Sequence, residues 1–313
     1  MAITSGLDEN LTQQLLDVKL PSLPAIVVQL IGLGRSASSN VDRLTAIISQ
    51  DPAITVALIR LANAALYHRA EPAETLLEAT SRLGYERSRV IAISATVLPA
   101  LRSIHAPGLP YEAYWRRSLI AGVAARSIGQ RLRPDDVESI FLAAMLQDIG
   151  ILALAQLPVG IYRDIPNGTY THEAAIECER ELIKEDHGAV GARLLEEWDF
   201  PARFIRAVRL SNVPGITPFT PDLRDLAGLV RASGLLADLW LRAGTHPELT
   251  SYRAEIGRLL GMEWQTVVEL VADASSEIPQ VEALCGVQIP NVEDMRLALL
   301  ILREPSESES PPE

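Results

Sequence analysis

The sequence predicts an all-α protein, and three observations support this fold class. Apolar residues recur at helical spacing along nearly the whole chain, whereas strand-like alternation is scarce. Of the 313 residues, 48% are hydrophobic but only 5% are aromatic, so Ala, Leu, Ile and Val must supply a core of the kind that suits close-packed helices. The residues between the apolar runs are those that begin and end helices.

The first fifty residues predict short helices separated by clear breaks. Residues 8–18 form a short amphipathic start, and the Pro-containing segment 21–24 breaks it and begins a second helix. A polar turn follows at 36–40. Asp51-Pro52 then predicts a strong helix start, because Asp accepts bonds from unpaired N–H groups and Pro fits the first helical position.

Two further helices are expected before the middle of the chain. Thr75 and Glu78 have the spacing of a capping box, and Gly84 fits the stop of that helix. The next helix runs over residues 86–102, and Pro99 within it should kink or end the helix.

Longer helices follow the APGLP segment at 106–110, which is the best internal boundary. We expect them near 111–132, 135–157, 172–185, 188–198, 201–211, 222–243, 248–260, 264–276 and 292–303, with loops at 158–168 and 213–221. These elements predict a multi-helical bundle in two packed lobes, an N-terminal lobe at 15–105 and a second lobe at 110–245. C-terminal helices at 246–303 should pack on it, and the acidic tail at 304–313, which has no apolar residue, should be disordered.

The charge distribution argues against sequence-independent binding of nucleic acid. The formal net charge is −12, yet residues 1–110 hold 9 Lys/Arg and 9 Asp/Glu, which leaves 19 and 31 for residues 111–313. This acidic second part lacks the excess of Lys and Arg that neutralises phosphates. No nucleic-acid partner is therefore expected.

Localisation is expected to be cytoplasmic. The N-terminus lacks the basic start and apolar stretch of a signal peptide, and no apolar run reaches the ~18 residues that span a bilayer. Cys178 and Cys285 are isolated, as ordinary thiols of a reducing compartment would be. We therefore expect no membrane partner.

Gly32 to Ala37 formally matches the GxGxxA fingerprint of dinucleotide sites. That fingerprint needs a helix that opens at the glycines to hold a pyrophosphate, whereas a polar turn follows here. The end of a helix is the favoured interpretation.

Several short motifs follow one another in order between residues 20 and 101. They are Leu20-Pro21, Leu23-Pro24, Asp51-Pro52, Arg60-Leu61-Ala62-Asn63-Ala64 and Leu83-Gly84. Their order and spacing resemble the HDOD domain, a bacterial signalling relative of the HD superfamily, and the resemblance covers about residues 20–240. Asn63 is a polar side chain on an apolar helix, and a satisfied structural amide is favoured over a ligand contact.

A second resemblance lies in the helical run FLAAMLQDIGILALA. It resembles the metal-binding helix of HD-domain phosphohydrolases, where a His-Asp pair stands in place of Gln147-Asp148. The resemblance further implies that the first His ligand falls at Arg117, the next His at His187 and the distal Asp at Asp238. Ile151 stands where active relatives often have Lys.

These departures remove chemistry that an HD-type metal site needs. Neutral imidazoles and carboxylates bind the divalent cation that acidifies water or polarises phosphate. Arg117 and Gln147 supply no imidazole, and Arg117 adds a permanent cation that repels a metal but pairs well with a carboxylate. We therefore expect no metal, no other cofactor and no catalytic residue, and hypothesise that Arg117 reaches Asp148 or Asp238. The alternative is that Arg117 faces water.

The remaining polar candidates have structural interpretations. Without partner imidazoles, His187 is favoured as a residue that begins a helix, and Ser118 has neither a base nor a nucleophile-elbow motif. The histidines with no ligand spacing to one another are His68, His105, His172 and His246. The charge run expected to form a solvated helix face is Glu177, Glu179, Glu181 and Glu185.

The resemblance implies a non-catalytic bacterial signal-transduction protein. It would act through contacts with other signalling proteins or by sensing a ligand such as a nucleotide second messenger. The alternative is a metal-dependent phosphohydrolase of HD type that acts on nucleotides or cyclic dinucleotides. HD relatives that degrade cyclic di-GMP carry a GYP signature, and this sequence has none.

Overall fold

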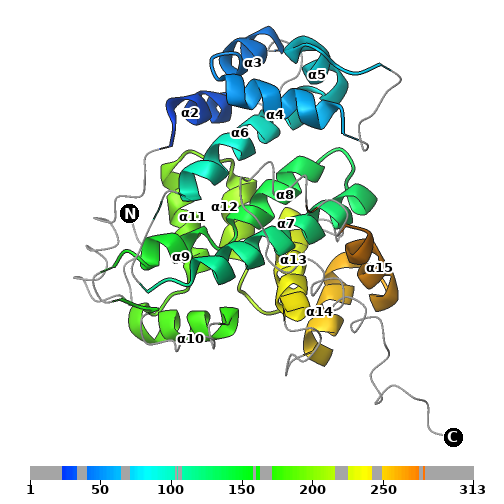
Figure 1. Ribbon diagram of the computed structural model, residues 1–313. Coiled ribbons are helices and arrows are strands. Elements are labelled where there is room, and N and C mark those ends of the chain that lie inside the picture. The colour runs from blue at the N-terminus through cyan, green and yellow to red at the C-terminus, as the bar shows by residue number, and fades with distance from the viewer. Residues whose placement is uncertain are drawn as a thin grey trace, which may run out of the picture.

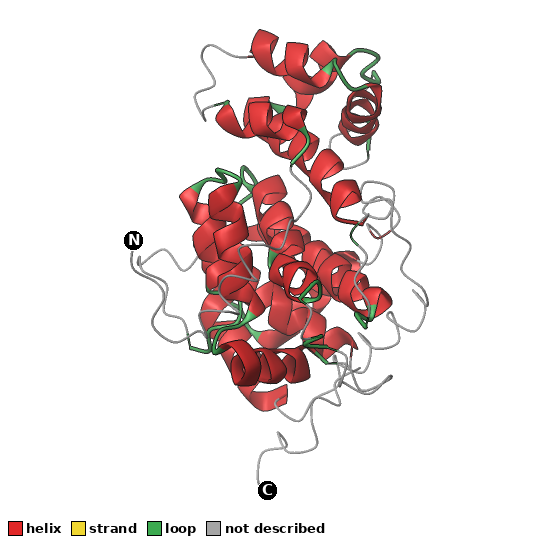
Figure 2. Cartoon of the chain, turned by 90° about the vertical axis from the view of Figure 1, so that its left-hand side faces the viewer, coloured by secondary structure: helices red, strands yellow, loops and turns green. Residues whose placement is uncertain are grey.

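The computed structural model describes residues 23–33, 41–64, 71–102, 104, 108–157, 160–162, 171–215, 225–241, 249–274 and 278. Within these ranges the chain forms helices, turns and loops and no strand, which confirms the predicted all-α fold class (Figure 2).

Four short helices form the N-terminal lobe at the top of Figure 1. They are α2 (Ala25–Gly32), α3 (Val41–Ile48), α4 (Pro52–Ala62) and α5 (Leu76–Leu83). α2 ends at Gly32, as the helix-end interpretation of the GxGxxA match predicts, while residues 34–40 lie outside the described ranges. α4 begins at the predicted start, since the Asp51 carboxylate accepts from the N–H groups of Ala53 and Ile54.

The capping box predicted before α5 is present. The Thr75 side chain accepts from the backbone N–H of Glu78, and the Glu78 carboxylate accepts in return from the backbone N–H of Thr75. Gly84 ends the helix with a φ of 86°, a conformation that favours glycine. These local signals set both ends of the helix.

Asn63 ties the end of α4 to the chain that precedes α5. Its Nδ2 donates to the carbonyl oxygen of Ala73 at 2.8 Å, and its Oδ1 accepts from the Ala73 N–H at 2.7 Å and from Arg82 Nη1 at 2.9 Å. Both polar atoms of this amide are therefore paired within the lobe, which confirms the predicted structural amide.

α6 (Tyr85–Arg102) joins the two lobes. It contacts α2, α3, α4 and α5 and also α8 of the second lobe. The helix continues for three residues beyond Pro99, so the expectation that this proline could end it is wrong. Residues 108–110 of the predicted boundary lie between α6 and α7.

The second lobe surrounds one long central helix, α7. Its helices are α7 (Tyr111–Leu132), α8 (Val137–Leu146), α9 (Ile149–Leu154), α10 (His172–Ile183), α11 (His187–Glu197), α12 (Ala202–Arg209) and α13 (Leu226–Leu241), with α14 (Leu249–Leu260) and α15 (Trp264–Ala274) beside them. α7 contacts α8, α13 and α15, whereas α11 contacts α9 and α12. Buried side chains form one hydrophobic cluster that extends through both lobes. The predicted helix at 292–303 and the tail at 304–313 lie outside the described ranges.

The single helix predicted over 135–157 is two helices with a break between them. Gln147 follows the last residue of α8, and Asp148 occupies the N-cap position of α9. The apolar pattern continues through the break, so periodicity alone did not detect it. The break places the Gln-Asp dipeptide in a turn between two buried helices.

The stretch Val137–Leu154 is long and apolar enough to pass as a membrane span by length and composition, which the sequence analysis did not expect. All of it is buried inside the fold. α8 and α9 are therefore core helices, a class that passes the same test.

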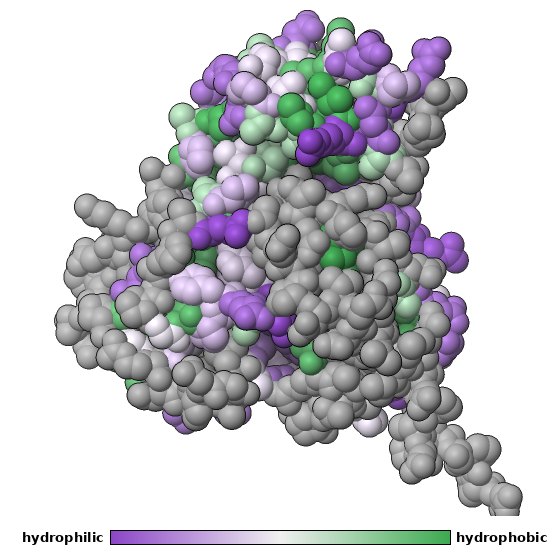
Figure 3. Space-filling model, viewed as in Figure 1, coloured by the Kyte–Doolittle hydropathy of each residue, from purple (hydrophilic) through white to green (hydrophobic). Residues whose placement is uncertain are grey.

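The surface of the N-terminal lobe mixes hydrophobic and hydrophilic side chains (Figure 3). Large hydrophobic residues exposed on its helices include Val28, Val56 and Leu77. Single exposed apolar side chains are common in folded proteins and require no special explanation.

Candidate functional site

Arg117 lies in a buried ionic cluster of the second lobe. It projects from α7, and its Nε and Nη2 donate to Asp238 Oδ1 and Oδ2 at 2.7 and 3.0 Å. Its Nη1 donates to Asp148 Oδ2. Arg117 is only 6% exposed, so it does not face water. The hypothesised contact is present, and the guanidinium binds both carboxylates at once.

The charges of this cluster keep one another ionised. Burial by itself raises the pKa of Asp148, but the charge of Arg117 and the nearby imidazoles of His172 and His187 outweigh it and hold that pKa well below its usual value. Burial likewise acts against ionisation of Asp238, and Arg117 and His172 lower its pKa in spite of it. The two carboxylates in turn raise the pKa of Arg117 against the effect of burial.

Gln147 packs beside Arg117 but is tied to its own helix. Its Nε2 donates to the carbonyl oxygen of Ala144 at 2.9 Å, and the residue is 1% exposed. Gly234 on α13 leaves space for both side chains. A Cβ at Gly234 would lie 2.5 Å from Gln147 Oε1 and 3.2 Å from Arg117 Nη2.

Two histidines begin two helices and meet at the other side of Asp148. Thr171 caps α10 and Asp186 caps α11, so His172 and His187 take the first helical positions. Their Nε2 atoms lie 3.0 Å apart. The helix-start interpretation of His187 is confirmed. The expectation that it lacks a partner imidazole is wrong, because two helix starts separated in sequence converge in space.

Glu179 lies fully buried behind His187. Its Oε2 lies 2.8 Å from His187 Nδ1 and accepts from the His187 backbone N–H at 2.7 Å, while its Oε1 accepts from the Tyr162 hydroxyl at 2.7 Å. Burial lowers the pKa of His187, but Glu179 and Asp148 outweigh it and raise that pKa to about 10. The predicted solvated face is therefore wrong at Glu179, although Glu181 on the same helix is exposed.

The cluster fits a divalent cation on one side of Asp148 and not on the other. Between Asp148 and Asp238, where the HD resemblance puts a metal, the Arg117 guanidinium binds both carboxylates and supplies the positive charge. An ion does not fit there. On the opposite side, Asp148 Oδ1 lies 3.4 Å from His187 Nε2 and 3.6 Å from His172 Nε2. These three atoms are close enough together to hold one ion.

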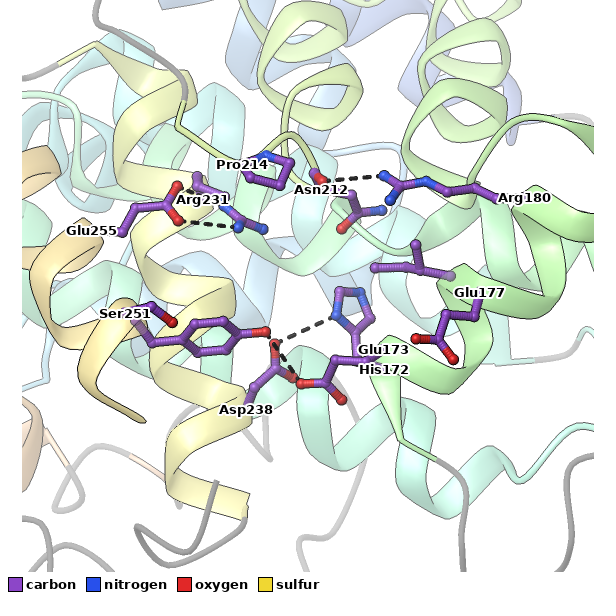
Figure 4. A pocket seen from close by; sticks show the side chains of 12 residues that line it. His172, Glu173, Glu177, Arg180, Asn212, Pro214, Arg231, Asp238, Ser251 and Glu255 are labelled. Carbon is purple, nitrogen blue, oxygen red and sulfur yellow. Dashed lines mark hydrogen bonds and ion pairs between the residues drawn. The ribbon is translucent and has the colours of Figure 1, made fainter. Parts of the chain in front are cut away.

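A pocket of about 290 Å³ opens beside the histidines, between α10, α13 and α14. Figure 4 shows His172 directed at Asp238, and His172 Nδ1 lies 3.4 Å from Asp238 Oδ2. Arg231 on another wall is paired with Glu255 at 3.2 Å. Asn212 also lines the pocket, and its Nδ2 lies 2.9 Å from His187 Nε2. A small molecule in the pocket would therefore lie next to the ionic cluster.

The structure brings together the predicted positions Arg117, Gln147, Asp148, His187 and Asp238, whereas Asn63 lies apart in the N-terminal lobe. Sequence reasoning missed His172, Glu179 and Asn212. One signal was available for His172: a capping residue is followed at once by histidine twice, as Thr171-His172 and Asp186-His187.

Comparison with known proteins gives a family and a set of related folds. The family model of the HDOD domain matches residues 20–214. No curated protein is significantly similar to the chain.

Solved structures from three bacteria share the fold. An HDOD domain protein of unknown function from Geobacter sulfurreducens is 19% identical with a TM-score of 0.62, over 90% of this chain and 94% of that one. A candidate phosphohydrolase from Shewanella amazonensis is 22% identical with a TM-score of 0.64, over 89% and 97%. A candidate signal transduction protein from Marinobacter aquaeolei is 19% identical with a TM-score of 0.61, over 90% and 62%.

The family match and the helical architecture agree with each other. The match spans more than half of the chain, from the segment before α2 to the end of the turn after α12. The sequence motifs behind the HDOD resemblance include the Asp51 cap and the Gly84 stop, both of which have the expected local structure. The chain therefore belongs to the HDOD domain family.

Proposed function

We propose that this protein is a non-catalytic signal-transduction regulator of the cytoplasm. It acts through contacts with other signalling proteins or by sensing a small ligand, such as a nucleotide second messenger, in the pocket beside His172. The observation that carries the proposal is the position of Arg117 between Asp148 and Asp238. An HD-type hydrolase uses its metal there to acidify water or polarise phosphate. Arg117 supplies the charge but no coordination position for water, and it stays protonated.

The pocket supports the ligand-sensing form of this proposal. Its volume of about 290 Å³ is close to the lower end of the ~300–1,000 Å³ of small-molecule sites. Its walls combine the amide of Asn212 and the guanidinium of Arg231 with acidic groups. Such groups can recognise a polar ligand. A bound ligand would also contact His172 and Asp238 of the neighbouring ionic cluster and so change their interactions.

Hydrolysis and binding assays together test this function. The purified protein is incubated with nucleotides and cyclic dinucleotides in the presence of Mg²⁺, Mn²⁺ or Fe²⁺, and product is measured. We expect no turnover above the protein-free control. Calorimetry with cyclic di-GMP and guanosine tetraphosphate then separates ligand sensing from protein contact. A binding heat that is present in the wild type and absent in Asn212→Ala supports ligand sensing. If neither ligand gives a binding heat, the function is sought in protein partners captured from the native host.

A metal-dependent phosphohydrolase is the second candidate function. One observation favours it: Asp148, His172 and His187 can hold an ion. The solved relative from Shewanella amazonensis is also described as a candidate phosphohydrolase. Turnover that needs an added dication and disappears in Asp148→Asn would establish this activity and overturn the non-catalytic proposal.

A further inference from the structure

We propose that Asp148, His172 and His187 form a binding site for a single first-row transition-metal dication. The site lies beside the Arg117 position and does not overlap it. Two imidazoles and one carboxylate are ligands that Zn²⁺, Fe²⁺ and Co²⁺ accept. The inference goes beyond the proposed function, because such an ion can hold helices in place or tune ligand binding without any hydrolysis.

The three ligand atoms have the separation that one ion requires. Ligand atoms about 2.1 Å from an ion, and about 90–120° apart, are separated by about 3.0–3.6 Å. Here the separations are 3.0 Å between the two Nε2 atoms, and 3.4 and 3.6 Å from them to Asp148 Oδ1. All three residues are buried, so the arrangement is set by the packing of the helices and not by side-chain freedom at the surface.

Asp148 Oδ1 is a buried acceptor without a hydrogen bond. Arg117 binds the other oxygen, Oδ2, and leaves Oδ1 directed at the histidines. An unsatisfied buried carboxylate oxygen is unfavourable, and the few such groups in folded proteins call for an explanation. An ion at this point supplies the missing partner.

Each histidine has a carboxylate at the nitrogen that faces away from the site. Glu179 lies 2.8 Å from His187 Nδ1, and Asp238 lies 3.4 Å from His172 Nδ1. A carboxylate behind the imidazole favours the proton on Nδ1 and leaves the Nε2 lone pair toward the site, which is the usual arrangement around metal-bound histidine. In the absence of an ion, one Nε2 donates to the other at 3.0 Å, and an ion that takes the place of that proton binds both nitrogens.

The charges of the cluster leave room for a dication. The buried carboxylates of Asp148, Asp238 and Glu179 carry three negative charges, and Arg117 carries one positive charge. One divalent cation balances the remainder once it displaces the proton that His187, with its raised pKa, otherwise carries. Arg117 on one side of Asp148 and the ion on the other side together neutralise the three carboxylates.

Asn212 offers a fourth group at the side of the pocket. Its amide nitrogen lies 2.9 Å from His187 Nε2, and its Oδ1 is buried without a hydrogen bond. The two ends of an amide are assigned from their surroundings. Turning the amide brings its oxygen toward His187, where it can serve as a further ligand. Because Asn212 and His172 line the pocket, an ion has a route into the site.

Metal uptake by the full chain tests the proposal directly. The protein is freed of metal with a chelator, titrated with Co²⁺, and followed by its visible spectrum, by bound metal per chain and by thermal unfolding. We expect one Co²⁺ per chain, a spectrum of nitrogen and oxygen ligation, and a higher Tm. His172→Gln should abolish all three effects.

Glu179→Gln and Glu181→Gln form a matched pair on the same helix. Glu179→Gln should weaken Co²⁺ binding about 10–100-fold, since it removes the carboxylate behind a ligand. Glu181→Gln should leave the affinity unchanged, because Glu181 is exposed. Both variants are checked for native circular dichroism before titration.

Two results would overturn the proposal. One is a wild-type protein that takes up no Co²⁺ or Zn²⁺. The other is uptake that stays the same in His172→Gln and in Glu179→Gln. If His172→Gln does not fold, Glu179→Gln alone decides, by its affinity relative to Glu181→Gln. None of these measurements depends on turnover, so failure of the metal site and failure of the non-catalytic proposal remain distinguishable.

Discussion

Arg117 organises the buried charges around Asp148 and Asp238 in the second lobe. Its planar guanidinium offers five N–H donors in a fixed fork, of which two reach Asp238 and one reaches Asp148. A lysine would bring the same charge without this geometry. The net stability gained from such a buried cluster is small, but removing one partner leaves the other charges unpaired in the core.

Arg117→Met should lower the free energy of unfolding by about 3–5 kcal/mol, since two buried carboxylates lose their cation. Arg116→Met is the control, because the neighbouring Arg116 pairs with the exposed Glu112 and should matter by less than about 1 kcal/mol. Urea unfolding followed by circular dichroism measures both. If both variants lose the same small amount of unfolding free energy, the buried cluster does not need the guanidinium of Arg117.

The loss of unfolding free energy caused by Arg117→Met should depend on pH. In the wild type, the pKa values of Asp148 and Asp238 are lowered, so these groups stabilise the fold above the ordinary carboxyl pKa of about 4 and lose this effect as pH falls further. Without Arg117, only the imidazoles oppose the effect of burial, so both pKa values rise, and the stability that the two carboxylates add at neutral pH is reduced or reversed. The difference in unfolding free energy between the wild type and Arg117→Met should therefore be smaller at pH 5 than at pH 7, as measured by urea titrations of both proteins. A larger difference at pH 5 would contradict this account.

At the scale of helices, the site is made where three helix starts converge. Asp148 precedes α9, His172 begins α10 and His187 begins α11. α9 and α11 approach closely because Gly150 has no side chain. A Cβ at Gly150 would lie 2.0 Å from the carbonyl oxygen of His187 and 2.8 Å from the N atom of Gly191. Backbone atoms cannot rotate away as a side chain can.

Gly150→Ala should destabilise the fold by about 3 kcal/mol or more, because α9 and α11 must move apart. Gly32→Ala in α2 is the control, since a Cβ there meets nothing within 4 Å. Alanine in a helix is favoured over glycine by about 0.5–1 kcal/mol, so this variant should be slightly more stable than the wild type. Thermal unfolding compares the two, and similar Tm values for both variants would refute the close approach.

At the scale of the whole molecule, the lobes share a core and a polar junction. α6 crosses from one lobe to the other, and the hydrophobic cluster is continuous through both. At the junction, Arg203 of α12 lies 3.9 Å from Glu86 of α6, and it donates to Asp136 and Ser139 of its own lobe at 2.7 Å each. A continuous core of this kind favours unfolding of the lobes in one cooperative step.

Arg203→Met should lower stability by about 1–3 kcal/mol through the loss of charge-assisted hydrogen bonds within the second lobe. The loss of its contact with Glu86 of α6 should also broaden or split the unfolding transition. Arg209→Met on the same helix removes only a pair with the partly exposed Glu196 and should leave a single transition. Scanning calorimetry shows the shape of both transitions. An unchanged, single transition in Arg203→Met would show that the core alone couples the lobes.

Local sequence signals determined most of the helices. The Asp51 cap, the Thr75–Glu78 box and the Gly84 stop depend on hydrogen bonds within a few residues, so a short stretch of sequence is enough to predict them. The break at Gln147 and Asp148 escaped prediction because both sides of it are buried and equally apolar. Periodicity reports which residues are buried, and it does not report where a buried helix turns.

The sequence by itself determined the all-α class, the HDOD resemblance and the identity of Arg117, Asp148 and Asp238 as residues that share a site. Only the tertiary structure decided that His172 and the buried Glu179 belong there as well. The reason is separation along the chain. Arg117 and Asp238 meet across 121 residues, and the two histidines meet only because the starts of α10 and α11 are packed at one point. No local pattern encodes that convergence; the packing of the helices around α7 produces it.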